Sequence, residues 1–166
     1  GIDELFYAVR HLKKENENFV LDLVGFFEDE YKEQVKELEK HSIAHFYGFQ
    51  SDPRPFYIEA DCVVLPSYHE GMSNVLLEAA ATGRPVITSN IPGCRESVEN
   101  GKSGLLVEVK NKEMLYDAMK EMLHCSREER EQMGQAGREK MEREFRKEVV
   151  VEKTVQSLRE DEKRDF

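Results

Sequence analysis

Short apolar runs alternate with amphipathic helical patterns along the first two thirds of the chain. Between the runs, hydrophobic residues recur at helical spacing, as Leu5, Val9 and Leu12 do near the start. The runs that have the length and composition of strands are FVLDLVG (19–25), IAHFYG (43–48), DCVVLPS (61–67), GRPVITS (83–89) and SGLLVEV (103–109). Strands and helices in this alternation predict right-handed βαβ units. The expected fold is an α/β domain with a Rossmann-like, doubly wound parallel sheet.

From Glu113 onward the pattern is almost entirely helical and becomes highly charged. We therefore expect one domain over residues 1–166, with a βαβ core over 1–110 and a helical segment over 111–166. The chain opens inside a helix start with no strand before it, which indicates a piece of a longer protein.

The composition and net charge of the chain argue against two classes of function. A formal charge of −10 and a pI near 5.1 argue against a general nucleic-acid surface, which needs a basic stripe. They also argue against electrostatic adhesion to an anionic membrane. The three cysteines lie far apart and have no metal or redox spacing, and Cys62 is expected to be a small core residue. No apolar run reaches membrane-spanning length, so the cytoplasm is the expected location.

The stretch EGMSNVLLEAAATG, residues 70–83, follows the strand predicted at 61–67. Ligands of doubly wound sheets bind beyond the carboxyl ends of the strands, which is where this stretch begins. Ser73 is the expected N-cap of a buried helix, and Gly71 lets a ligand approach the backbone. A glycine-containing loop that leads into a helix N-terminus is a natural phosphate site, although the signal alone is weak.

The two carboxylates of this stretch suggest that the site also binds sugar hydroxyls beside the phosphate. Glu78 is the only charged residue from Val75 to Ala81, one turn beyond Asn74. A carboxylate accepts paired hydrogen bonds, which suits the vicinal diol of a ribose. Glu70, in the loop, could reach a sugar hydroxyl. The alternative stays open that Glu78 pairs with Arg84 and that Glu70 is simply solvated.

The region LPSYHEGMSNVLLEAAATGRPVITSNIPGCRESVENGKSGLLV resembles the C-terminal domain of family 4 retaining glycosyltransferases, which have the GT-B fold. The family signature is a Glu, seven residues and a second Glu, here Glu70 and Glu78. GIDELFYAV, LDLVG and FYGFQSD resemble the opening half of the same domain. The likeness covers essentially the whole chain and is nearest to the sugar transferases of bacterial capsule and lipopolysaccharide.

The resemblance implies a role for each matching position. Glu70 would contact the donor sugar near the reacting carbon, and Glu78 would bind the ribose hydroxyls. Phe49 would contact the base, mostly through its backbone. The group that would surround the diphosphate is Gly71, the backbone amides of Met72, Ser73 and Asn74, and Val75.

The resemblance also sets limits. It implies no cofactor and no metal, and His69 beside Glu70 is not a ligand set. The family's phosphate-clamping Arg and Lys would precede Gly1, and the N-terminal acceptor domain is not in this chain. We therefore expect a nucleotide-sugar-binding domain that is catalytically silent and a weak binder alone. Its partners would be the donor, the missing domain and a glycan or lipid-linked acceptor, and the parent enzyme could lie at the inner face of the membrane.

Other functions remain open at this stage. A GT-B nucleotide-sugar 2-epimerase shares the architecture, and a non-catalytic nucleotide-binding or assembly module could keep the fold without turnover. A Rossmann-like domain with a structural Glu pair is the third alternative. The apolar positions in EVVVEKTVQSL would be exposed without the other domain and would favour self-association.

Smaller features are interpreted as structural. Gly93 and Glu96 fit a turn and the acid of a helix start better than a donor cleft. Tyr68 and His69 are expected on the loop surface, and the other histidines are expected to be structural.

Overall fold

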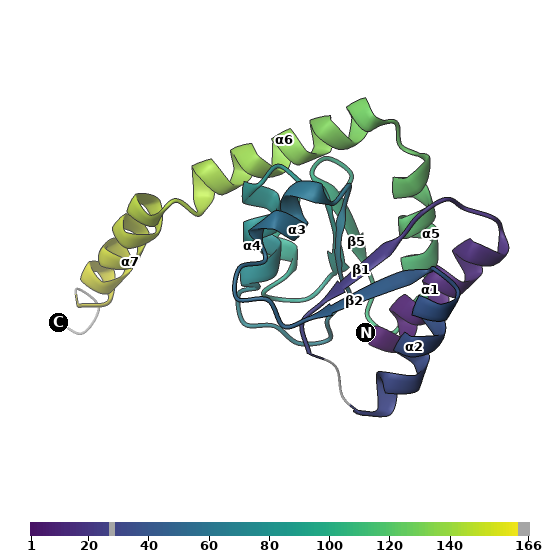
Figure 1. Cartoon of the computed structure of the whole chain (residues 1–166). Coiled ribbons are helices and arrows are strands. Elements are labelled where there is room, and N and C mark those ends of the chain that lie inside the picture. The colour runs from purple at the N-terminus through teal and green to yellow at the C-terminus, as the bar shows by residue number, and fades with distance from the viewer. Residues whose placement is uncertain (27–28, 163–166) are drawn as a thin grey trace.

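The computed structural model describes residues 1–26 and 29–162, with side chains described through Arg159. Helices pack on both faces of parallel strands, and the last helix extends away from the rest of the molecule (Figure 1). The strands are β1 (Leu21–Val24), β2 (Ala44–Gly48), β3 (Val63–Leu65), β4 (Val86–Ser89) and β5 (Gly104–Val107). The helices are α1 (Ile2–Lys14), α2 (Lys32–Lys40), α3 (Arg54–Glu59), α4 (Asn74–Ala81), α5 (Lys112–His124), α6 (Arg127–Glu144) and α7 (Lys147–Glu162), with 3-10 turns η1 (Asp29–Tyr31) and η2 (Arg95–Ser97).

The strand pairing is parallel throughout, as predicted. β1 pairs with β2, in the register of Leu21 opposite Ala44, and β3, β4 and β5 form a second ladder in that order. The α/β class is confirmed, but the hydrogen bonds of the described residues divide the strands into two sheets instead of one. Leu23 of β1 and Val64 of β3 pack on one core, which holds the sheets together.

β4 explains why the core has two sides. All four of its residues are buried, and alternate side chains of a strand point to opposite faces. Ile87 joins the larger core cluster beneath α1, α2 and α5, whereas Val86 joins the smaller one beneath α3 and α4. The coverage extends to the polar residues of the strand, because Thr88 and Ser89 are buried as completely as Val86 and Ile87.

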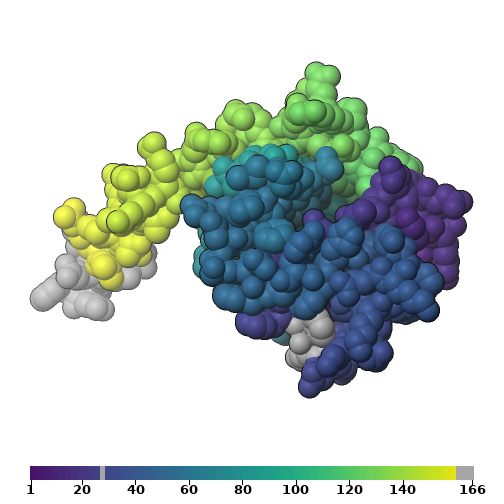
Figure 2. Space-filling view, viewed as in Figure 1, coloured from purple at the N-terminus to yellow at the C-terminus, as the bar shows by residue number. Residues whose placement is uncertain are grey.

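α6 docks on the smaller side through glycine. A Cβ built at Gly134 would lie 1.9 Å from the carbonyl oxygen of Gly83, so the helix approaches that turn more closely than any side chain allows. α7 lacks such packing and projects as an arm (Figure 2). Its exposed apolar side chains are Val150, Val151, Val155 and Leu158. The expectation that this segment exposes apolar residues is confirmed; its self-association stays a prediction.

Candidate functional site

The candidate site is built on the loop that follows β3 and on the start of α4. This loop lies at the carboxyl edge of the β3–β4–β5 sheet, where the parallel strands end together. Gly1 also reaches this edge, because a Cβ built there would lie 1.8 Å from the carbonyl oxygen of Pro66. The two predicted carboxylates, Glu70 and Glu78, flank the helix start in between.

A turn at Gly93 fixes the shape of the loop. Gly93 has a φ of +86°, and a Cβ there would lie 1.7 Å from the carbonyl oxygen of Gly71. Its own carbonyl accepts a 3.0 Å hydrogen bond from the Ser73 N–H. The Glu96 carboxylate in turn accepts from the Gly93 N–H at 2.8 Å. The structural interpretation of Glu96 is therefore confirmed, and Gly93 is the glycine against which the site loop packs.

The start of α4 leaves backbone donors without partners. Ser73 is the N-cap residue, as predicted, but its side chain makes no capping hydrogen bond and is buried. Among the described residues, no acceptor contacts the N–H groups of Met72, Asn74 or Val75. The Ser73 N–H is bonded to the Gly93 carbonyl in this conformation, and the contact of the Ser73 amide with a diphosphate stays a prediction.

Glu70 is half-buried and held in place. Its Oε1 accepts a 2.8 Å hydrogen bond from the Ser67 hydroxyl. The alternative of a simply solvated carboxylate is therefore wrong. Oε2 remains available for a second donor, because no bond to it occurs among the described residues.

Glu78 lies on the solvent side of α4, which corrects the expectation of a helix buried all round. Helical periodicity points Leu76, Ala79 and Ala80 into the core and turns Glu78 outward. The apolar run concealed this because Val75 and Ala81, which are exposed like Glu78, are also apolar.

The partner of Glu78 is the phenol of Tyr57. Tyr57 donates to Glu78 Oε2 at 3.2 Å. Burial, together with the Glu78 carboxylate, raises the pKa of Tyr57 to about 12, so the phenol stays a donor. The Arg84 guanidinium instead donates to the carbonyl of Ile58, and no ion pair joins it to Glu78 in the described part of the chain. The predicted alternative of a Glu78–Arg84 pair is thus wrong.

Phe49 follows β2 and is exposed, with its ring stacked on that of Phe26. Tyr47, two residues earlier, packs edge-on against Phe56 of α3 at 4.9 Å between centroids. Because Phe56 precedes Tyr57, one short helix connects the end of β2 to the Glu78 carboxylate. The contacts of α3 thus link β2, the strand that precedes Phe49, to the helix that carries Glu78.

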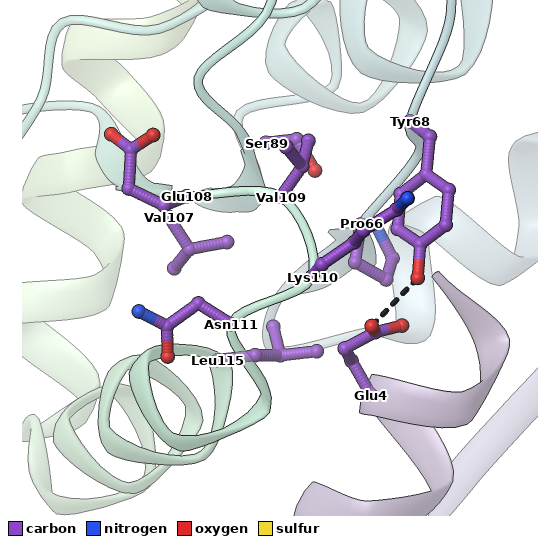
Figure 3. A pocket seen from close by; sticks show the side chains of 10 residues that line it. All are labelled: Glu4, Pro66, Tyr68, Ser89, Val107, Glu108, Val109, Lys110, Asn111 and Leu115. Atoms are coloured by element: carbon purple, nitrogen blue, oxygen red, sulfur yellow. Dashed lines mark hydrogen bonds between the residues drawn. The ribbon is translucent and has the colours of Figure 1, made fainter.

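A small pocket that the sequence did not indicate lies beside the loop (Figure 3). Tyr68 donates to Glu4 Oε1 at 2.6 Å, and this bond raises the pKa of Tyr68 to about 12. Lys110 Nζ lies 5.4 Å from the centre of the Tyr68 ring. Tyr68 lies on the loop, as predicted, but it is half-buried, and its bond to Glu4 of α1 was not foreseen from the sequence. His69 is exposed, as predicted.

The pocket also holds polar atoms without partners. Ser89 Oγ and Glu4 Oε2 are both buried and make no hydrogen bond to the described residues. Together with the bond between Tyr68 and Glu4, they place a polar lining directly behind the site loop. The residues that line this pocket therefore connect the loop after β3 to α1 and to the ends of β4 and β5.

Two further findings concern ligands and membranes. No group of three or more His, Cys, Asp or Glu side chains is arranged to hold a metal ion among residues 1–26 and 29–162. Over the same residues, no helix combines the length and the apolar character that a membrane crossing requires. Independence from metals stays a prediction.

Parallel strands with helices on both faces define a Rossmann-like domain. Residues 1–140 match the family model described as glycosyl transferases group 1. The chain belongs to this family, and the predicted membership is confirmed.

The relatives and structural neighbours agree with this assignment. The chain is 28% identical to the capsular polysaccharide biosynthesis glycosyltransferase CapM of Staphylococcus aureus over 92% of its length. It is 30% identical to the lipopolysaccharide core biosynthesis glycosyltransferase LpsE of Rhizobium meliloti over 68%. It covers 40% and 33% of these two proteins, so it spans less than half of their length.

Solved structures show the same fold. Sucrose-phosphate synthase from Thermosynechococcus elongatus superposes with a TM-score of 0.77 and 26% identity, covering 93% of this chain and 41% of that one. Anabaena Alr3699/HepE in complex with UDP superposes with a TM-score of 0.72 and 18% identity, covering 95% and 55%. The predicted fold, one Rossmann-like half of a GT-B enzyme, is confirmed.

Proposed function

We propose that this chain binds the nucleotide-sugar donor of a retaining glycosyltransferase that builds a bacterial polysaccharide. The parent enzyme would transfer the sugar to a glycan or a lipid-linked acceptor. The observation that carries the proposal is the placement of Glu70 and Glu78 on either side of a helix start with unpaired amides. The UDP held by Alr3699/HepE, a protein of the same fold, supports a nucleoside diphosphate as ligand.

Glu78 binds the ribose of the donor in this proposal. Its carboxylate is exposed and oriented by Tyr57, which donates to Oε2 and leaves Oε1 free. A vicinal diol offers two O–H donors, and a carboxylate is the side chain that accepts both. Phe49, at the end of β2, contacts the base in this arrangement.

The diphosphate lies over the start of α4. The unpaired N–H groups of Met72 and Asn74 and the positive end of the helix dipole attract anions. Gly71 is exposed, and a Cβ there would meet no protein atom within 4 Å, so the space above it is open for a ligand. Val75, also exposed, flanks the phosphates.

The same backbone amides stabilise the diphosphate as it leaves the sugar. When the bond between the sugar and the diphosphate breaks, negative charge grows on the departing phosphate oxygens. Fixed amides and a helix dipole stabilise that charge in the transition state more than in the ground state. Glu70, held by Ser67, faces the sugar hydroxyls near the reacting carbon in this proposal. No metal ion is required for these steps.

The chain alone supplies one wall of the reaction site. We propose that the acceptor and further phosphate-binding groups come from a second domain, as the short coverage of CapM and LpsE suggests. The isolated chain would then bind donor weakly and transfer nothing.

Calorimetric titration of the chain with UDP and with GDP tests the proposal. We expect weak binding of at least one of them, reduced about tenfold or more by Glu78→Ala because the ribose contacts are lost. Glu152→Ala, which removes an exposed carboxylate from α7, is the matched control and should change nothing. A folded chain that binds neither nucleotide at millimolar concentration would overturn the proposal.

Incubation of the longer parent enzyme with nucleotide sugars and acceptors tests the reaction class. A product that keeps the anomeric configuration of the donor is expected. Release of an epimerised nucleotide sugar would instead establish the epimerase alternative, and failure to transfer any sugar would support a non-catalytic binding module.

A further inference from the structure

A hydrogen bond between distant parts of the chain ties the loop of the candidate site to α1. The hydroxyl of Tyr68 donates to Glu4 Oε1 at 2.6 Å, although the two residues are 64 positions apart (Figure 3). Lys110, just before α5, has its Nζ 5.4 Å from the centre of the same ring. The first turn of α1 therefore holds the hydroxyl of Tyr68, while the segment after β5 lies against its ring.

The segment that contains Tyr68 also orients the carboxylate of Glu70. Ser67, the preceding residue, donates to Glu70 Oε1 at 2.8 Å. Beyond Glu70 the loop is held a second time, because a Cβ built at Gly93 would lie 2.7 Å from the Glu70 carbonyl oxygen. Glu70 thus lies between two anchors, Tyr68 on the side of β3 and the Gly93 turn on the side of α4.

The bond between Tyr68 and Glu4 carries an energetic cost. Glu4 Oε2 is buried and makes no hydrogen bond to the described residues. A buried carboxylate oxygen without a partner loses the hydration that it has in water, and two apolar side chains would avoid that loss. A hydrogen bond is directional, however, whereas apolar contact is not. The polar pair therefore imposes one geometry on the loop.

We propose that Tyr68 is a positioning residue, whose hydrogen bond to Glu4 holds the loop so that Glu70 faces the donor sugar. The inference rests on the proposed function, which assigns the sugar to Glu70. The contacts proposed for the phosphates and the ribose lie beyond Glu70, on the start of α4 and on Glu78, which Tyr57 orients. Loss of the Tyr68 bond should therefore displace Glu70 and leave those contacts intact.

NMR relaxation of the backbone amides tests the positioning in the chain itself. In Tyr68→Phe the order parameters of the His69 and Glu70 amides should fall from about 0.85 toward about 0.6, because the loop loses its anchor on α1. The amide of Asn74, beyond the second anchor, should stay rigid. An unchanged order parameter at Glu70 would overturn the proposal, and so would an equal fall at Asn74, which would show a general loosening.

Two single variants serve as controls. Glu4→Gln keeps an oxygen that accepts from the phenol, so its loop should be as rigid as that of the unaltered chain. Tyr7→Phe removes a hydroxyl of α1 that makes no hydrogen bond to the described residues, and it should also change nothing. If Glu4→Gln loosens the loop as much as Tyr68→Phe does, the hydrogen bond is not what holds it and the proposal fails.

A double variant separates positioning from stability. Glu4→Met with Tyr68→Phe replaces both polar partners by apolar side chains of similar size, so the midpoint of denaturant unfolding should be no lower than that of the unaltered chain. The Glu70 amide should nevertheless remain mobile. A rigid loop in this double variant would show that packing alone holds Glu70, which would overturn the proposal.

Kinetics of the longer parent enzyme test the link to the sugar. Tyr68→Phe should lower kcat about tenfold and change the KM for the nucleotide sugar less than about twofold, because Glu70 acts near the reacting carbon. An unchanged kcat, or a rise in KM alone, would overturn the proposal. If the unaltered parent transfers no sugar, the proposed function fails, while the relaxation of the chain still decides whether Tyr68 positions Glu70.

Discussion

The phenol of Tyr57 donates a 3.2 Å hydrogen bond to the carboxylate of Glu78, joining α3 to the solvent face of α4. The two residues are separated by a strand and a loop in the sequence, yet they form one unit of the candidate site. Tyr57 is buried and Glu78 is exposed, so the core determines the orientation of a surface carboxylate.

Tyr57→Phe tests this relationship. The variant removes one hydrogen bond to a charged group while keeping the buried ring, so we expect it to lower the free energy of unfolding by about 1 kcal/mol. UDP affinity should fall about fivefold, because Glu78 loses the donor that orients it. Denaturant unfolding and calorimetry measure the two effects. Unchanged affinity in a folded variant would show that Glu78 needs no such support.

Gly93 and Gly71, which lie against each other, can be compared by substituting each with alanine. Gly93→Ala should lower the free energy of unfolding by about 2 kcal/mol or more, because its φ is positive and its Cβ would collide with Gly71. Gly71→Ala should change stability by only about 0.5 kcal/mol, since no protein atom lies near its Cβ, but should weaken UDP binding by filling the space of the ligand. Thermal unfolding and titration of both variants separate the two roles; equal destabilisation by both would contradict this assignment.

The sequence was most informative about features that depend on a single helix, strand or loop. The run GRPVITS predicted the strand β4, and the Glu70–Glu78 spacing, through the family resemblance, predicted both carboxylates of the candidate site. The contacts of Gly93 with Gly71, of Tyr68 with Glu4 and of Phe26 with Phe49 join residues far apart in the chain. Only the fold brings these together, so no local pattern could have revealed them. The exposure of Glu78 was hidden because two other exposed positions of the helix, Val75 and Ala81, are also apolar.

Alkaline pH should destabilise the chain through two phenols. Tyr57 and Tyr68 have folded pKa values of about 12, above the ordinary value of 10.0. The unfolded chain therefore loses these protons first, so their contribution is intact below pH 10 and is lost as the pH rises toward 12. Stability measured by denaturant across this range should fall less steeply in Tyr57→Phe and in Tyr68→Phe. A slope unchanged in both variants would contradict the raised pKa values.

The apolar side chains of α7 should promote self-association of the isolated chain. The Val151 and Leu158 side chains are 53% and 61% exposed, and Val151→Lys with Leu158→Lys replaces both by charge. Sedimentation velocity should show concentration-dependent association in the unaltered chain and a monomer in the double variant. A monomer at all concentrations in the unaltered chain would disprove this prediction.

In the proposed binding mode, a nucleoside diphosphate lies across the start of α4, with its ribose on Glu78. The most direct measurement is an NMR titration of the isotope-labelled chain with UDP, following the backbone amide of every assigned residue. We expect the largest shifts at Met72, Asn74, Val75 and Glu78, with a second group around Phe49, and loss of these shifts in Glu78→Ala. Shifts confined to other surfaces, or no shift at millimolar UDP, would rule out this binding mode.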